Sequence, residues 1–418
     1  MAEYLTNTTD LTKVASAIRE KGGTSDSLVY PDGFVTAIGN IQTGGGTTPG
    51  VPGDITFYDY DGTIVTSWTL EELATKTALP DYPSHDGLIC QGWNWSLADL
   101  KTTNRKMNVG AMYITDDGTT RIYIRLEEGR TSPMLGVCPN GTVTVDWGDG
   151  TTPDTLTGTD TSTVRWTPNH AYAAPGDYVI KLTVDGAMGF SGSVFPGNNS
   201  CLLRYSDEID ARNYLYLSAI SKIELGQGIT EIGGQAFFGC ASLQSVSIPA
   251  SIMSIGGNIA AECYSLKYCT IPDGAKKITD GAFTECHALT TIAIPNSIRY
   301  LGDKSFYNCY AMKTLTVPDI GNKPYFLIVS MFLVSCRAIS AFFIPNGIDG
   351  GVNPQLFDGC SGMKYYDFTQ WTSVPTLSNT NTFTGIPSDC QIRVPASLVN
   401  EWKAATNWST YADHIVGV

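Results

Sequence analysis

The second half of the chain repeats one pattern of apolar and polar positions. Each copy contains an alternating stretch of the form Leu-x-x-Val-x-Ile-Pro, such as Leu243, Val246 and Ile248, followed by an apolar pair such as Ile252 and Ile255. Alternation places these side chains on one face of a strand, and the proline ends that strand. Because the pattern recurs with a period above twenty residues, it predicts a solenoid whose coils stack on one another, over residues 221–390.

One cysteine marks the same phase of each copy, and successive cysteines are 23, 23, 23, 27 and 24 residues apart. They are Cys240, Cys263, Cys286, Cys309, Cys336 and Cys360. Neighbouring coils would carry nearly parallel Cβ vectors at this phase, which suits disulfides badly. A free cysteine behaves as a small buried hydrophobe, so we interpret the six as core residues. The longer interval before Cys336 predicts a bulge or an extra turn there.

The N-terminal third changes pattern several times. Helical periodicity, with Asp10 as N-cap and Pro31 opening a second helix, predicts a helical hairpin within residues 1–42. Residues 43–53, rich in Gly, Thr and Pro, form a predicted linker. The chain as a whole is therefore predicted to be mostly β and multidomain, with a helical N-terminal segment.

Residues 54–108 begin with two alternating stretches around Asp61-Gly62, a sequence typical of a hairpin turn, and Thr69 is placed to cap a short helix. The FYDYDGT opening and the later Gly92-Trp93 resemble the Listeria–Bacteroides repeat. That resemblance implies a β-grasp-like module of the kind found in bacterial surface proteins.

Residues 109–190 contain two further segments in order, TVTVDWGDGT and HAYAAPGDYVIKLTV. Together they resemble the PKD-type, immunoglobulin-like β-sandwich, which implies an extracellular spacer or adhesive module without enzymatic activity. In such a sandwich Val143 and Val145 would face Ile180, Leu182 and Val184 across the core. Residues 191–220 are then a connector to the solenoid.

Three aspartates of this module are candidate calcium ligands: Asp146, Asp149 and Asp177. Hard cations need several oxygen ligands, which carboxylates supply. The alternative is that Asp149 and Asp177 are turn residues that bond to their own backbone. We favour the turn interpretation and expect no metal site, since the four histidines are scattered and no CxxC pair is present.

The repeats themselves resemble the BspA-type leucine-rich repeat of bacterial surface proteins, over roughly residues 221–370. The pattern decays after Cys360, and residues 391–418 are predicted to cap the open end of the stack. There a helix from Ser397 would place Leu398, Val399 and Trp402 against the last coil.

Charge and motif content narrow the possible functions. The chain has 418 residues, with 26 Lys and Arg against 40 Asp and Glu, a net charge of −14 that disfavours nucleic acid and anionic membranes as partners. No stretch is long and apolar enough to span a membrane, and no secretory signal opens the sequence. No catalytic or nucleotide-binding motif is present, and Cys286-His287 lacks an orienting third group. We therefore expect neither enzymatic activity nor a cofactor.

Recognition is the remaining class, and one column of the repeat varies where its surroundings do not. The residues that follow the cysteines are Ala241, Tyr264, His287, Tyr310, Arg337 and Ser361. Of these, Tyr264, His287, Tyr310 and Arg337 are the candidate receptor contacts, suited to stacking on sugars or anchoring a protein. The alternative is an exposed phase that tolerates any residue. The outward strand positions Ser245, Ser247, Thr291, Thr314 and Thr316 are expected to form a solvated face, with the larger Tyr268 and Phe343 as the exceptions.

The segment LTKVASAIREKGGTSDSLVYPDGFVTAI resembles the opening of tail-associated phage and prophage proteins. It implies a phage tail fibre or receptor-binding protein in the virion, released by lysis, with the N-terminal helices on the tail or baseplate. The repeats would then contact a host glycan or protein, and the tail-fibre analogy suggests a homotrimer. Net charge makes a neutral polysaccharide or a basic protein patch a better receptor than an anionic polymer. The alternatives are a BspA-type adhesin on a bacterial surface and a purely structural virion protein.

Overall fold

The computed structural model describes residues 53–190, 202–204, 216–318, 327–346, 348 and 351–418. The predicted helical hairpin, nearly all of the linker and much of the connector lie outside these residues, as do residues 322–326 of the segment predicted to bulge before Cys336. The described part confirms a mostly β chain, and its α-helices are short: α3 (Leu70–Thr75), α4 (Leu97–Leu100) and α6 (Val399–Ala404). None of its helices has the length and hydropathy of a membrane span.

A four-stranded sheet with two short helices forms the first module. Its strands are β1 (Ile55–Tyr58), β2 (Ile64–Trp68), β3 (Leu88–Trp93) and β4 (Met107–Thr115), in the order β2-β1-β4-β3. The predicted hairpin joins β1 to β2, and Thr69 caps α3 in a reciprocal bond with Glu72. Strand β4 runs across the predicted boundary between residues 108 and 109, so the sheet includes residues as far as Thr115.

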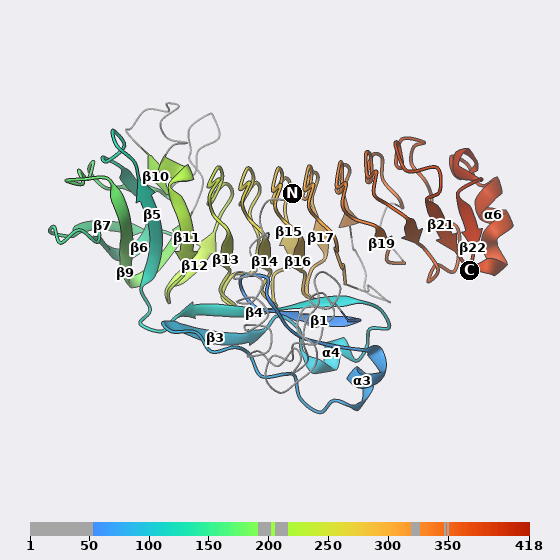
Figure 1. Ribbon diagram of the computed structural model, residues 1–418, viewed down its shortest axis with the longest axis horizontal. Helices are drawn as coiled ribbons and strands as arrows, with labels where there is room; N and C mark the ends of the chain where they lie inside the picture. The colour runs from blue at the N-terminus through green and yellow to red at the C-terminus, as the bar shows by residue number, and fades with distance from the viewer. Residues whose placement is uncertain (1–52, 191–201, 205–215, 319–326, 347, 349–350) are drawn as a thin grey trace, which may run out of the picture.

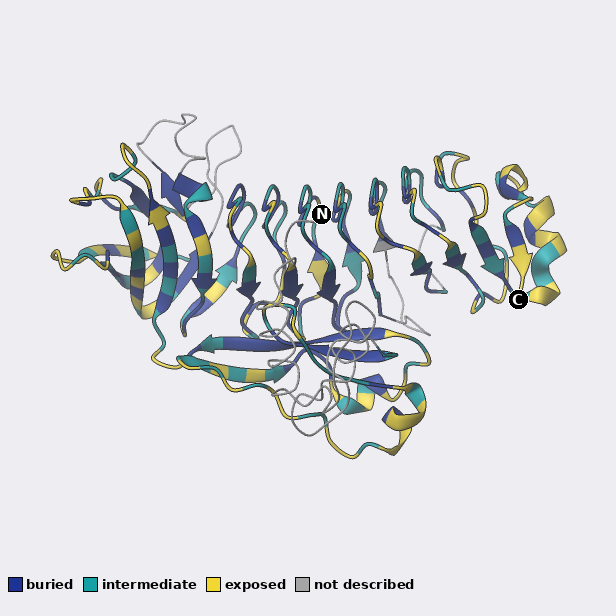
Figure 2. Ribbon diagram, viewed as in Figure 1, coloured by how far each residue is buried: buried dark blue, intermediate teal, exposed yellow. Residues whose placement is uncertain are grey.

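Both faces of this sheet are buried at β1 and β4 (Figure 2). On one face, Phe57, Val109 and Tyr113 pack into the module's own core. Alternation turns the residues between them, including Asn108 and Gly110, toward the solenoid. The module therefore lies flat against the strands of the repeats, as Figure 1 shows for β4 beneath β13–β16.

Polar pairs hold this contact together. The Asn108 side-chain amide donates to Thr291 Oγ1 at 2.8 Å, and its backbone N–H donates to Thr316 Oγ1 at 3.1 Å. The backbone N–H of Tyr113 donates to Ser247 Oγ at 2.8 Å. Each pair satisfies polar groups that would otherwise be buried without partners.

The prediction of a solvated strand face is therefore wrong over most of that face. Ser247 and Thr291 are buried. The two larger residues contact the first module: Tyr268 is fully buried and stacks on Tyr58, with ring centroids 5.3 Å apart, and the Arg105 guanidinium lies 3.9 Å from the Phe343 ring centroid. Thr314 alone of the five small positions named above is exposed. The repeat pattern shows which side chains leave the coil's interior, but it does not show that another module packs on them.

The second module also differs from its predicted arrangement. Its strands β5 (Thr120–Leu126), β6 (Met134–Asp146) and β9 (Gly176–Phe190) form one antiparallel sheet, joined at its edges by β7 (Asp154–Thr159), β8 (Arg165–Trp166) and β10 (Leu203–Arg204). Val143 pairs with Val184 and Val145 with Leu182 between adjacent strands. These residues are therefore neighbours in one sheet and do not face each other across a sandwich core.

This sheet continues directly into the solenoid. Strand β11 (Ile220–Glu224) pairs antiparallel with β5 and parallel with β13 (Ser245–Ser247), and β12 (Ile229–Ile232) pairs with β9. One hydrophobic core runs from Ile122 in the sheet through the coils to Ile415. The second module thus covers the first coil by strand pairing and shares its core, so it is not a separate spacer domain.

Three rows of short parallel strands build the coils. The first row continues from β13 through β14 (Tyr268–Thr270) to β16 (Thr291–Ala293). A second row holds β15 (Lys277–Ile278), β17 (Tyr300–Leu301) and β18 (Leu327–Ile328). The C-terminal row is β19 (Ala341–Phe343), β20 (Tyr365–Asp367), β21 (Gln391–Val394) and β22 (Ile415–Gly417). The inward residues that the repeat predicts, such as Leu243, Val246 and Ile248, are buried.

The cysteine phase is buried, as its spacing predicts, and the thiols from Cys263 to Cys360 at this phase each bond to a backbone oxygen. Cys263 and Cys286 donate through Sγ to the backbone oxygens of Phe237 and Ala260, one coil earlier, at 3.1 Å. Cys309, Cys336 and Cys360 repeat this bond. All ten cysteines among the described residues are free. Burial raises the pKa of thiols at the cysteine phase, as at Cys286.

Aromatic side chains fill the C-terminal end. The 3-10 helix η1 (Ala396–Leu398), α6 and the 3-10 helix η2 (Trp408–Tyr411) lie on the last coils, at the red end of Figure 1. Trp402 is fully buried and packs against Phe368 at 5.0 Å and Trp408 at 4.6 Å, while Leu398 and Val399 are half-buried. Trp408 is equally buried, and its indole N–H donates to Pro375 O at 2.8 Å.

Candidate recognition surface

The four candidate contact residues lie in one stacked row, which we call the ladder: Tyr264, His287, Tyr310 and Arg337. Ring centroids are 4.9 Å apart between Tyr264 and His287 and 4.7 Å apart between His287 and Tyr310. The Arg337 guanidinium follows, 5.1 Å from the Tyr310 ring centroid. Tyr264 is 42% exposed and the His287 side chain 38% exposed. The structure thus brings all four together at one accessible edge of the solenoid.

The turn before the ladder has an unusual backbone that the sequence did not reveal. The residue preceding each cysteine has a positive φ of 59–73°: Gly239, Glu262, Glu285, Asn308, Ser335 and Gly359. Side chains other than glycine rarely adopt this conformation, and they are held here by the coils on either side. Glycine at this phase in two of the coils was the signal that could have predicted it.

Polar groups of this turn orient His287, which lies between Tyr264 and Tyr310 in the ladder. His287 Nε2 lies 2.7 Å from Glu285 Oε2, and the Asn308 side-chain amide donates to Glu285 Oε1 at 2.6 Å. Glu285 therefore links two consecutive coils and orients the imidazole between its two tyrosine neighbours. The Tyr264 hydroxyl also faces a carboxylate, with its oxygen 3.5 Å from Glu262 Oε2.

Stacking within the ladder changes what it offers to a ligand. His287 has a ring on each side, and Tyr310 lies between His287 and Arg337. The faces of these two rings are therefore occupied, and sugar stacking on them, one of the two expected uses, is not available in this arrangement. The ladder instead presents ring edges, hydroxyl and imidazole hydrogen-bonding groups, and a cation.

A row of lysines beside the ladder was missed in the sequence. Lys267, Lys313 and Lys364 are exposed and occupy the phase three residues beyond the ladder phase. Backbone bonds align this phase from coil to coil: Thr290 N donates to Lys267 O at 3.0 Å, and Lys313 N donates to Thr290 O at 2.8 Å. We call these three residues the lysine row. Comparing the residues three positions after each ladder position would have shown it in the sequence.

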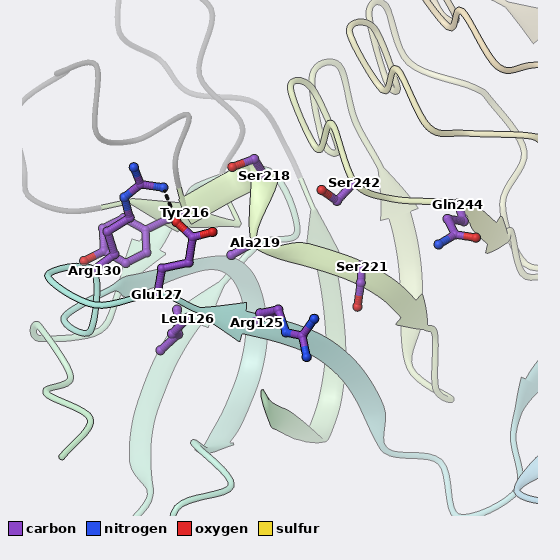
Figure 3. A pocket seen from close by; sticks show the side chains of 10 residues that line it. All are labelled: Arg125, Leu126, Glu127, Arg130, Tyr216, Ser218, Ala219, Ser221, Ser242 and Gln244. Atoms are coloured by element: carbon purple, nitrogen blue, oxygen red, sulfur yellow. Dashed lines mark hydrogen bonds and ion pairs between the residues drawn. The ribbon is translucent and has the colours of Figure 1, made fainter. Parts of the chain in front are cut away.

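A small hollow of about 250 Å³ lies at the start of this edge (Figure 3). Arg125, Glu127 and Arg130 line it from the β5 side, and Ser242 and Gln244 line it from the first coil. The Arg130 guanidinium contacts Glu127 Oε2 at 2.9 Å. Arg125 likewise pairs with an acid, Asp177, at 2.9 Å. Charges around the hollow are thus neutralised within the chain.

The three aspartates considered for calcium are engaged separately. Asp149 accepts from the Thr151 backbone N–H at 3.1 Å, as a turn residue does, and also faces His170 Nε2 at 2.8 Å. Asp177 instead pairs across strands with Arg125, so the interpretation of it as a turn residue is wrong. No group of three metal-ligating side chains occurs among the residues that the structure describes.

Residues 207–324 match the model of the BspA type leucine rich repeat region, in six copies. The match confirms the predicted repeat type for this part of the chain. The described coils continue beyond it, through β20 and β21, to the C-terminal end. The chain is therefore a mostly β protein that contains BspA-type leucine-rich repeats over residues 207–324.

Similar solved structures include other leucine-rich-repeat proteins. T. pallidum TpLRR is 16% identical, covering 48% of this chain and 83% of that one, with a TM-score of 0.30. Pneumococcal vaccine antigen PcpA is 15% identical, covering 46% and 54%, with a TM-score of 0.35. A Bacteroides ovatus leucine-rich repeat protein is 16% identical, covering 56% and 78%, with a TM-score of 0.27. These overlaps are too weak to support an argument about function. Among curated proteins none matches the chain.

Proposed function

We propose that this chain is an adhesin-like recognition protein of a bacterial cell surface and that it binds its partner through the ladder. The observation that carries the proposal is the ladder itself: two tyrosines, a histidine and an arginine aligned on four successive coils and accessible to solvent. Aromatic and arginine side chains are the types that contribute most to binding at protein surfaces. The BspA-type repeats, which resemble those of bacterial surface proteins, support the location.

The strand face of the solenoid is covered by the first module, which supports the ladder edge as the binding surface. The first module buries much of the row β13–β16, and the second module and the C-terminal aromatic residues occupy the two ends. The ladder edge remains accessible along the coils and repeats with their period. An extended partner that contacts several coils would therefore find matching groups there.

The tail-fibre prediction has less support. It rests on the resemblance of the N-terminal helical segment, which lies outside the described residues, and neither the repeat match nor the similar structures point to a virion. Attachment to a tail or baseplate and assembly as a trimer remain predictions tied to that segment. Of the predicted roles, the surface adhesin agrees better with the repeat type.

A variant of the full chain tests the proposal. Replacing Tyr264, His287, Tyr310 and Arg337 together with Ala should reduce adsorption of the labelled protein to bacterial and mammalian cells by at least tenfold. The substitutions should preserve the fold because Ala241 already occupies the same phase in another coil. Flow cytometry measures adsorption, and thermal unfolding checks the fold.

Tyr82→Ala is the matched control, since Tyr82 is 50% exposed and lies outside the ladder. It should adsorb like the unmodified chain. Equal adsorption of the ladder variant and the unmodified chain would contradict the proposal, as would failure of the unmodified chain to adsorb to any cell type tested.

A further inference from the structure

The lysine row alternates with uncharged polar residues along the edge. In order of the coils, the phase holds Gln244, Lys267, Thr290, Lys313, Ser340 and Lys364. Backbone bonds join successive members on both sides of the longer repeat, including Lys267 N to Gln244 O and Lys364 N to Ser340 O. A cation therefore occurs on every second coil, and a neutral hydrogen-bonding group lies between.

The coil spacing sets the distance between these charges. Parallel strands lie about 4.8 Å apart, so lysines on alternate coils are separated by about 10 Å. One coil is close to the advance of one hexose in an extended polysaccharide, and two coils are close to one disaccharide. The row therefore has the period of a polymer that is charged at every second sugar.

These cations are available to a ligand. Lys267, Lys313, Lys364 and the neighbouring Arg337 form no ion pair with any residue in the described ranges; Lys267 contacts the neutral Gln244 Oε1 at 3.3 Å. Arg121, Arg125, Arg130 and Lys222, by contrast, each contact a carboxylate. The unpaired cations of the edge are aligned on one side of the solenoid.

The acidic total of the chain does not cancel this local charge. Salt screens charges beyond about 8 Å at physiological ionic strength, so nearby groups dominate contact with a bound polymer. The carboxylates next to the ladder are Glu262 and Glu285, and Glu285 already bonds to His287 and Asn308. Net charge alone favours a neutral receptor, whereas the arrangement at this edge favours an anionic one.

We propose that the ladder edge binds an extended acidic polysaccharide that carries one carboxylate on every second sugar. The lysine row and Arg337 contact the carboxylates, while Thr290, Ser340 and the exposed edges of the ladder rings hydrogen-bond to the hydroxyls of the intervening sugars. This inference rests on the proposed function and gives its ligand a chemical class.

Polysaccharides with different charge spacing test the proposal on the full chain. Hyaluronan has one carboxylate per disaccharide, polygalacturonate has one per sugar, and dextran has none. We expect the chain to bind hyaluronan at least fivefold more tightly than polygalacturonate and to show no binding to dextran, as measured by biolayer interferometry. Raising NaCl from 50 to 300 mM should weaken hyaluronan binding at least tenfold.

Position-matched variants provide the control. Changing Lys267, Lys313 and Lys364 to Gln should weaken hyaluronan binding at least tenfold. Changing Lys276, Lys277 and Lys304 to Gln alters the net charge equally at other exposed positions of the same solenoid and should have little effect. Equal losses in the two triple variants would overturn the proposal, as would equal binding to dextran or binding to lipoteichoic acid without binding to hyaluronan.

The two proposals fail in distinguishable ways. If the ladder variant loses cell adsorption while the lysine variant retains it, recognition by the ladder stands and the acidic polysaccharide is excluded. If both variants adsorb to cells like the unmodified chain, both proposals fail. Loss of cell adsorption and of hyaluronan binding in the lysine variant supports both.

Discussion

At the scale of single residues, position in the coil explains the repeated cysteine. The cysteine position is fully buried, and its side chain faces a backbone oxygen of the preceding coil. A small side chain with a weak hydrogen-bond donor fits this position. The spacing was sufficient to predict burial. The thiol-to-carbonyl bond was not predictable, because it depends on the register between coils and not on the order of residues within one.

This bond predicts a difference between two equally buried cysteines. Cys286→Ala should reduce the free energy of unfolding by about 1 kcal/mol more than Cys269→Ala, since a typical internal hydrogen bond contributes about that amount. Both residues are fully buried, but Cys269 bonds only weakly, to the backbone oxygen of its own neighbour at 3.7 Å. Urea unfolding followed by circular dichroism measures both values, and equal losses would show that the inter-coil bond contributes nothing.

At the scale of elements, the main difference from the sequence prediction is the covered strand face. Periodicity correctly divided each coil into inward and outward positions, but it cannot reveal what packs on the outward ones. The evidence lay in β4, whose sequence MNVGAMYIT carries no charge although only one face of it can enter its own module. A strand that is apolar or uncharged on both faces indicates burial on both.

Gly110 is the residue whose size controls this contact. A Cβ there would meet Tyr268 Oη at 2.5 Å and Thr270 Cγ2 at 2.7 Å. Gly110→Ala should therefore reduce the free energy of unfolding by about 1–3 kcal/mol and increase hydrogen exchange at β4. Tyr268→Phe and Thr270→Ala remove the obstructing atoms. Adding Gly110→Ala to that double variant should therefore cost less free energy of unfolding than Gly110→Ala costs in the unmodified chain. If Gly110→Ala costs the same in the double variant as in the unmodified chain, its effect does not come from contact with Tyr268 and Thr270.

At the scale of the molecule, the parts form a compact assembly around the solenoid. The sequence order suggested modules strung between an attachment segment and a distal repeat array. In the structure the first module lies along the coils, and the second continues their sheet (Figure 1). Sequence patterns correctly predicted the repeats and the alignment of the four ladder residues, whereas contacts between residues as far apart as Asn108 and Thr291 had no local signal.

The ladder edge stays accessible in the described part of this arrangement, and radical footprinting tests its role in recognition most directly. Hydroxyl radicals oxidise accessible tyrosine, histidine and methionine side chains, so the full chain can be compared free and adsorbed to cells, with oxidation read by mass spectrometry. We predict protection at Tyr264, His287 and Tyr310, and unchanged oxidation at Tyr82 and Met253, which are 50% and 58% exposed. Protection of Tyr82 or Met253 with unchanged oxidation of the ladder would contradict the account.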